Sequence, residues 1–186
     1  MIITRYALLG ALAFAMPAQA AFRPAPNTSH TVDLDTAAGA FSVWDAKDLT
    51  GINAAHIHFR VNQVRSDKKW APSFNFVLKR GNESVGIGLI GFAGKKPLLI
   101  ALKRSGAEDE AFLLPTEVGE ENDLEITWTP AGDASFTLKN AKTQGVTKTG
   151  EHHTGKLSGA PEMLHIMSST GELEVMSIVL GSDDGR

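Results

Sequence analysis

The sequence of 186 residues contains 18 Lys plus Arg, 21 Asp plus Glu and no Cys. One ordinary domain is therefore expected, and a small fold held together by disulfides is excluded. With 42% hydrophobic and 21% charged residues the chain can build a core, which excludes disorder of the whole chain. The formal net charge of -3 gives no whole-chain attraction for nucleic acid or for an acidic membrane surface.

The first twenty residues have the pattern of a cleaved signal peptide. Arg5 supplies the positive start, Ala7 to Met16 is an apolar run, and Ala18-Gln19-Ala20 is a small-x-small cleavage site. The residue after the expected cut is Ala21 and not Cys, so we expect no lipid anchor. These features predict a periplasmic or secreted protein that has no membrane anchor.

The rest of the chain divides into three expected parts. An extended lead-in over 21–30 contains two prolines, a folded domain covers 31–181, and a polar tail covers 182–186. Within 53–64 of the folded part, the apolar residues Ala55, Ile57, Phe59 and Val61 alternate with the polar residues His56, His58, Arg60 and Asn62. This period of two is typical of a strand with one buried face and one wet face.

Similar alternation occurs in 74–79, 124–128 and 135–138 and predicts three more strands. Four runs that are mostly apolar at successive positions predict central strands: Val85–Phe92, Pro97–Leu102, Met163–Met167 and Leu173–Leu180. Two shorter strands are expected at Thr31–Asp35 and Phe41–Trp44. About ten strands at this spacing indicate an all-β, two-sheet sandwich.

Turns and connections complete the expectation. Gly81, Gly132 and Gly171 lie where hairpins need a positive φ. The segment 107–114 fits a helix or a strand equally well, because acidic residues suit a first helical turn but Pro115 follows. The segment 144–159 is rich in Thr, Lys, Gly and His, and is expected to be a long surface connection.

The second half of the chain resembles a known superfamily. A strand ending in Ile126-Thr127-Trp128, a turn at Gly132 and a strand through Phe136-Thr137-Leu138 are followed by the segments 160–166 and 171–179. This order, over Ala55 to Leu180, resembles the concanavalin A-like lectin/glucanase superfamily. The resemblance implies an antiparallel two-sheet jelly-roll sandwich and a protein that binds or acts on glycans.

The enzymatic branch of that superfamily can be compared with the acidic residues. Family 16 glycoside hydrolases carry Glu-x-Asp-x-Glu on one strand, because one carboxylate attacks or stabilises while another donates a proton. Glu172-Leu173-Glu174 and Asp123-Leu124-Glu125 both lack the third acid, and each pair fits a solvated strand face. A hydrolase or lyase that uses Glu125 with a His is therefore kept as the alternative to a non-catalytic protein.

His56 and His58 are the sharpest local feature. Residues two apart on a strand share a face at a spacing of about 6.5 to 7 Å, so two imidazoles could chelate one metal if a third ligand came from elsewhere. The third ligand would be His152, His153 or His165. The plainer interpretation is a polar strand face, and we predict no metal site and no cofactor.

The leading hypothesis is an exported, non-catalytic binding module for a glycan or a cell-envelope component. Trp70 lies in a charged loop, where it could stack on a sugar ring or a partner, or fold back as a lid over the sandwich edge. The predicted ligand-binding residues form a polar strip on adjacent strands together with this tryptophan: His56, His58, Arg60, Trp70, Asn75 and Lys79. A protein-interaction domain that docks through strand edges or the Trp70 loop is a further alternative.

Overall fold

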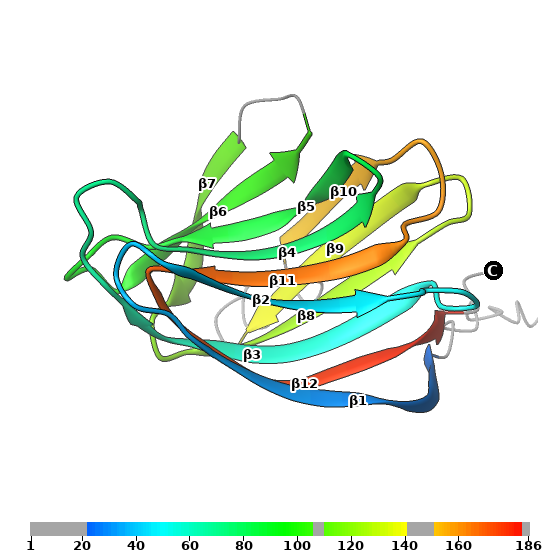
Figure 1. The fold of residues 1–186 in the computed structure, drawn as a ribbon, viewed down its shortest axis with the longest axis horizontal. Helices are drawn as coiled ribbons and strands as arrows, with labels where there is room; N and C mark the ends of the chain where they lie inside the picture. The colour runs from blue at the N-terminus through cyan, green and yellow to red at the C-terminus, as the bar shows by residue number, and fades with distance from the viewer. Residues whose placement is uncertain (1–21, 106–109, 141–150, 184–186) are drawn as a thin grey trace, which may run out of the picture.

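The computed structural model describes residues 22–105, 110–140 and 151–183. Over these ranges the chain forms twelve β-strands and no helix (Figure 1). The strands are β1 (Phe22–Asp35), β2 (Phe41–Lys47), β3 (Ala54–Val64), β4 (Ser73–Arg80), β5 (Glu83–Ile90), β6 (Pro97–Arg104), β7 (Glu110–Glu117), β8 (Glu121–Trp128), β9 (Asp133–Asn140), β10 (Glu151–Lys156), β11 (Met163–Ser169) and β12 (Gly171–Asp183). The described part of the chain thus contains no helix long and apolar enough to cross a membrane. The expected signal peptide, residues 1–20, lies outside the described residues.

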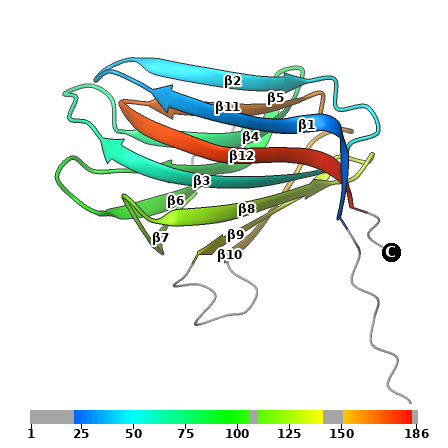
Figure 2. The same cartoon turned by 90° about the horizontal axis from the view of Figure 1, so that it is seen from below.

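The strands form two six-stranded sheets. Sheet A has the order β1-β12-β3-β8-β9-β10, and sheet B has the order β2-β11-β4-β5-β6-β7. All the strand pairings are antiparallel. The two sheets lie face to face as a jelly-roll-like sandwich, seen from a second side in Figure 2. The predicted fold class is confirmed.

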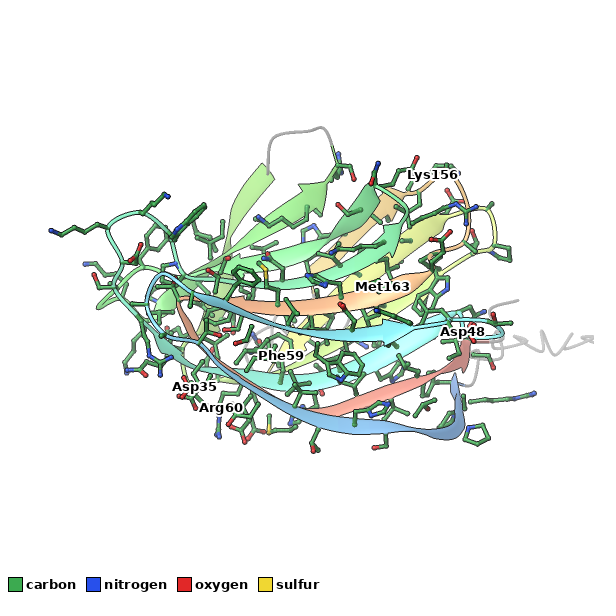
Figure 3. All side chains as sticks on the ribbon, viewed as in Figure 1. Asp35, Asp48, Phe59, Arg60, Lys156 and Met163 are labelled. Atoms are coloured by element: carbon green, nitrogen blue, oxygen red, sulfur yellow. The ribbon has the colours of Figure 1, made fainter. Side chains whose placement is uncertain are left out.

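The core lies between the sheets and is built from the alternating residues. In β3 the side chains of Ala55, Ile57, Phe59 and Val61 are buried, as the period of two predicts. Phe59 of sheet A meets Phe76 of sheet B with ring centroids 4.6 Å apart (Figure 3 labels Phe59). Each buried side chain of this size contributes about 1.5 to 3 kcal/mol through removal from water. Contacts of this kind hold the two sheets together.

The sheet extends beyond the predicted domain at both chain ends. β1 begins at Phe22, and Phe22 to Pro24 pair with Asp183 to Gly181 of β12. Most of the expected lead-in over 21–30 is therefore part of sheet A, as is the beginning of the expected tail. Pro24 and Pro26 fit here because β1 is an edge strand, where a missing N–H does not interrupt a ladder on the outer side.

One strand lies where the sequence predicts a surface connection. β10 occupies Glu151–Lys156, within the segment 144–159, and pairs with β9. It is the edge strand of sheet A, and edge strands carry polar residues because one side of them faces solvent. Because the residues of β10 are mostly polar, the sequence shows no alternation of apolar and polar residues there, and the strand was not predicted. Residues 144–150 of the same segment lie outside the described residues.

The described part of the segment 107–114, for which the sequence allows a helix or a strand, belongs to a strand. β7 covers Glu110–Glu117 at the edge of sheet B, and Leu113 pairs with Leu99 of β6. The register shifts between Pro97 and Leu99, beside Pro115 of β7. An edge position tolerates a proline at such an irregularity. Residues 107–109 lie outside the described residues.

Two of the three predicted glycine turns have the expected backbone. Gly81 has φ 53° and Gly132 has φ 89°. The prediction is wrong at Gly171, because the left-handed residue of that turn is Thr170 with φ 57°. Gly171 is required for space instead: a Cβ there would lie 2.6 Å from the Gln63 carbonyl oxygen and 2.7 Å from Cζ of Phe74.

Removing the ring that joins the sheets should destabilise the whole domain. We expect Phe59→Ala to lower the free energy of unfolding by about 3 to 5 kcal/mol, since it leaves a cavity opposite Phe76. Urea denaturation followed by tryptophan fluorescence measures this loss. The control is Val43→Ala, because Val43 is exposed on β2 and its truncation should cost less than about 0.5 kcal/mol. Equal losses for both variants would contradict the proposed core.

Candidate functional site

The six predicted ligand residues lie in three separate places. His56, His58 and Arg60 are on β3 of sheet A, whereas Asn75 and Lys79 are on β4 of sheet B. The connection 65–72 crosses from one sheet to the other instead of forming a hairpin. The polar faces of β3 and β4 therefore point out of opposite sides of the sandwich, and the predicted continuous strip does not exist.

The polar face of β3 is an ion-pair network. The Nδ1 atom of His58 lies 2.7 Å from Oδ1 of Asp123, and its Nε2 atom lies 3.5 Å from Oε2 of Glu121. Arg60 donates from Nη2 to Oε2 of Glu174 at 2.7 Å. His58 and Arg60 are thus engaged by acids of the neighbouring strands β8 and β12.

The two histidines of β3 have different partners. The His56 ring stacks on Phe22 of β1 with centroids 3.9 Å apart, while His58 faces β8. The proposed third ligands are not near them, because His152 and His153 are on the edge strand β10 and His165 is in sheet B. Among the described residues no group of three or more His, Cys, Asp or Glu side chains is arranged so that it could hold a metal ion.

The sequence predicts a solvent-exposed polar face on β4, but Asn75 on this face is buried. Asn75 is only 7% exposed, and its Oδ1 atom has no hydrogen-bond partner among the described residues. Gly88 of β5 makes room for this amide, since a Cβ at Gly88 would lie 2.3 Å from Oδ1 of Asn75. Gly86 lies two residues before Gly88 in β5, and neither glycine causes a bulge, because the β4–β5 register is continuous.

The paired acids lie on the solvated face of sheet A, as expected. Glu174 accepts hydrogen bonds from Asn62 and Arg60, and these bonds hold the pKa of Glu174 below its ordinary value. Glu125 lies 2.6 Å from Nζ of Lys139, and it is the Cα partner of His56 across β3 and β8. Glu174 and Glu125 thus take part in ion pairs and hydrogen bonds with neighbouring side chains.

Two adjoining hollows lie at one end of the sandwich and were not predicted. A hollow of about 840 Å³ adjoins a second of about 600 Å³, and Asn53 and Trp128 line both. We call the two together the end groove. Its walls include Asp48, Arg80, Trp128, Asp133, Lys156, Glu162 and Asp183 (Figure 3 labels Asp48 and Lys156 at this end). The residues come from six separate segments of the chain, so no local motif marks the groove.

A close contact of two turns shapes the groove. The Leu157 N–H donates to the Gly132 carbonyl at 2.9 Å, which joins the β8–β9 turn to the β10–β11 loop. A Cβ at Gly132 would lie 2.3 Å from the Leu157 carbonyl oxygen and 2.7 Å from that of Gly159. The Glu83 carboxylate holds the same loop by accepting from the Ser158 N–H at 2.7 Å, a bond that lowers the pKa of Glu83.

The end of β12 forms another wall of the groove. Asn53 Nδ2 donates to the Asp183 carbonyl at 3.1 Å, and Asn53 Oδ1 accepts from the Asp183 N–H at 2.6 Å. This pair of bonds fixes the backbone of Asp183. Its side-chain Oδ1 atom is buried and has no hydrogen-bond partner among the described residues. A buried carboxylate oxygen in the wall of a hollow is a candidate acceptor for a ligand hydroxyl.

Trp70, the remaining predicted residue, lies in the 65–72 connection at the opposite end of the molecule. Its side chain is 54% exposed, so it does not close over the sandwich as a lid. Trp128, by contrast, is buried in the core, and Trp44 is partly buried and packs against the core. Trp70 is therefore available to a partner, but it cannot share a ligand with the β3 face or with the end groove.

No protein-family model and no curated protein sequence matches this chain. Solved structures share its fold at low sequence identity. A scytalido-glutamic peptidase with a transition state analog inhibitor is 11% identical at a TM-score of 0.53, over 89% of this chain and 84% of that one. The carbohydrate-binding module CBM66 from Bacillus subtilis is 6% identical at 0.52, over 90% and 99%.

A legume lectin-like domain from Entamoeba histolytica is 13% identical at a TM-score of 0.51, over 90% of this chain and 89% of that one. At such identities the similarity establishes the fold alone. That fold is the antiparallel two-sheet jelly-roll sandwich that the sequence resemblance implied. It is shared by binding domains and by a peptidase, so the site must decide between them.

The two turns of the groove can be tested by adding one methyl group. Gly132→Ala should lower the free energy of unfolding by more than about 2 kcal/mol, because it strains a positive φ and also pushes against two carbonyl oxygens. The matched control is Gly81→Ala, which has a positive φ but no atom within 4 Å of the new Cβ. The control should lose only about 1 to 2 kcal/mol. Similar losses in thermal or urea unfolding would exclude the contact.

The Glu174 network should give a stability difference that depends on pH. Because the folded state lowers the pKa of Glu174, its contribution is present above the ordinary Glu pKa of about 4.3 and is lost as the pH falls through the folded value. Glu174→Gln should therefore be less stable than the parent protein at neutral pH, and the difference, measured by urea unfolding, should shrink as the pH falls below the ordinary Glu pKa. Replacing the exposed Asp33 by Asn is the control and should change little at either pH. A difference that persists in acid would contradict the role of the charge.

Proposed function

We propose that this protein is an exported, non-catalytic binding module for a glycan or a glycan-bearing envelope component, and that the end groove binds the ligand. Carbohydrate-binding domains among the proteins of the same fold support the class of ligand. The size of the groove supports the position, since its larger hollow of about 840 Å³ falls within the range of about 300 to 1,000 Å³ typical of small-molecule sites.

The observation that carries the proposal is the Asp183 carboxylate. Its backbone is fixed by Asn53, and its buried Oδ1 atom lacks a hydrogen-bond partner among the described residues. Burying an acceptor without a donor costs about 1 to 3 kcal/mol. Asp183 lines the larger hollow, where a sugar hydroxyl would be the donor to its carboxylate, and Trp128 also lines this hollow.

The charges of the groove favour an uncharged ligand. Four acids and three basic residues line it: Asp48, Asp133, Glu162 and Asp183 with Arg80, Arg104 and Lys156. Two of the basic residues pair with groove acids, as Lys156 lies 2.5 Å from Asp133 and Arg80 lies 3.7 Å from Glu162. Because its positive and negative charges nearly balance, the groove attracts neither a strongly acidic nor a strongly basic molecule. Its charged side chains do provide donors and acceptors for hydroxyl groups.

Truncating the Asp183 carboxylate should weaken binding without unfolding the domain. We expect Asp183→Ala to weaken glycan binding about tenfold or more, because a hydrogen bond to a charged acceptor is lost while the backbone bonds to Asn53 remain. Glycan arrays identify the ligand, and titration calorimetry measures its affinity. Asp33→Ala, an acid removed from the exposed face of β1, is the matched control and should bind normally. Absence of binding to every envelope and plant polysaccharide would refute the proposal.

The hydrolase or lyase alternative is separated by turnover. Glu125 and His56 are Cα partners beside a small hollow of about 200 Å³, which is the arrangement that an acid acting with a histidine would need. In the proposed function the Glu125 carboxylate is instead a partner of Lys139. Reducing-end assays on the bound polysaccharides should stay flat. If a polysaccharide is cleaved and Glu125→Gln abolishes the cleavage, the protein is an enzyme and the binding-module proposal is wrong.

A further inference from the structure

Two loops meet at the end of the sandwich opposite the end groove. They are the β3–β4 loop over 65–72 and the β5–β6 loop over 91–96, at the left of Figure 1. The Gly91 N–H donates to the Pro72 carbonyl at 2.9 Å, which holds the loops side by side. We call them the paired loops. They lie next to each other because β4 and β5 form a hairpin whose open end is here.

The paired loops carry exposed aromatic side chains. Trp70 is 54% exposed in one loop and Phe92 is 47% exposed in the other. Phe41, which is 71% exposed, lies at the same end, because it pairs with Ser169 of β11 and Ser169 pairs with Ser73. Exposing large apolar rings to water is unfavourable, and Trp70 and Phe92 line one shallow hollow together, so they indicate a surface that is covered in use.

The same loops carry a local positive charge that the whole-chain value conceals. Lys68 and Lys69 precede Trp70, and Lys95 and Lys96 follow Phe92. All four lysines are exposed, although the formal net charge of the chain is -3. The Nζ atom of Lys69 lies 5.2 Å from the centre of the Trp70 ring. Lysine side chains of this kind keep their charge in water beside an apolar contact.

The single acid of the paired loops has a structural task. Asp67 accepts hydrogen bonds through Oδ1 from the backbone N–H groups of Lys69 and Trp70, both at 2.8 Å. These bonds lower the pKa of Asp67 and fix the turn that presents the ring of Trp70. Its charge offsets only one of the four lysines.

We propose that the paired loops dock this protein on the surface of an anionic phospholipid bilayer. Trp70 and Phe92 enter the interfacial region, where aromatic rings are favoured, and the lysines face the phosphates. Each lysine near an anionic surface contributes about a fivefold increase in partitioning. The mode is peripheral, requires no anchor, and leaves the end groove at the far end accessible.

The chemistry of the paired loops fits lipid better than a specific sugar. A sugar site needs fixed donors and acceptors around one ring, but the only carboxylate of these loops is occupied by backbone N–H groups. The aromatic rings are distributed over two loops and the start of β2, and the lysines are long and exposed. Such an arrangement suits many mobile headgroups at once. This inference is independent of the proposed glycan groove.

Vesicle sedimentation tests the proposal. The chain starting at Ala21 is used, because it contains all twelve described strands and lacks the apolar run 7–16, which would bind vesicles by itself. We expect binding to phosphatidylcholine vesicles that contain phosphatidylglycerol, and much weaker binding to phosphatidylcholine alone. Lys68→Ala with Lys69→Ala should lower the partition coefficient about 30-fold at low salt, and Trp70→Ala about tenfold.

The matched control removes the same charge elsewhere. Lys47→Ala with Lys79→Ala, on β2 and β4, should retain most of the binding. Equal binding to both vesicle types, no binding to either, or an equal loss in the control pair would overturn the proposal. It would also be overturned if an acidic polysaccharide, and not vesicles, bound with the same dependence on Lys68, Lys69 and Trp70. Loss of glycan binding in Asp183→Ala leaves the vesicle result unaffected, so the two proposals fail separately.

Discussion

Two apolar sheet faces packed against each other are the constraint on which this structure depends. With no cysteine in the chain, stability must come from burial of apolar side chains between the sheets. The contact of Phe59 with Phe76 lies on this interface and joins a strand of sheet A to a strand of sheet B. Because each strand must turn its apolar side inward, its polar side is forced outward, and the outward faces of the two sheets cannot meet.

Given that constraint, we propose that the functional surfaces lie at the ends of the sandwich. On the outer face of sheet A the charged residues partner one another, as His58 does with Asp123 and Arg60 with Glu174. At the ends, turns and strand termini from distant parts of the chain converge. One end is hollow and nearly balanced in charge, and the loops at the other end carry exposed aromatic rings and four exposed lysines. We infer two different surfaces on one domain, with a soluble ligand at the first and an extended surface at the second.

Loop positions in both ends are fixed by backbone hydrogen bonds and not by a helix or a disulfide. Gly132 admits the β10–β11 loop, Asn53 holds Asp183, and Asp67 fixes the turn before Trp70. Such bonds allow a small domain to keep its binding surfaces ordered although they lie outside the core. A side chain added at Gly132 would disturb a groove whose other walls are far away in sequence.

The sequence by itself determined the fold class and the inward and outward faces of β3, because strand alternation is a local property that one segment reveals. It could not determine that β3 and β4 belong to different sheets, since the same alternation suits a hairpin and a crossover equally well. For that reason His56 and Asn75 were expected together and are apart. Only the tertiary structure brought Asp48, Trp128 and Asp183 into one groove, and Lys68 and Lys95 to one end. Those neighbours are set by strand order and by hydrogen bonds across the whole chain, which no local pattern of residues contains.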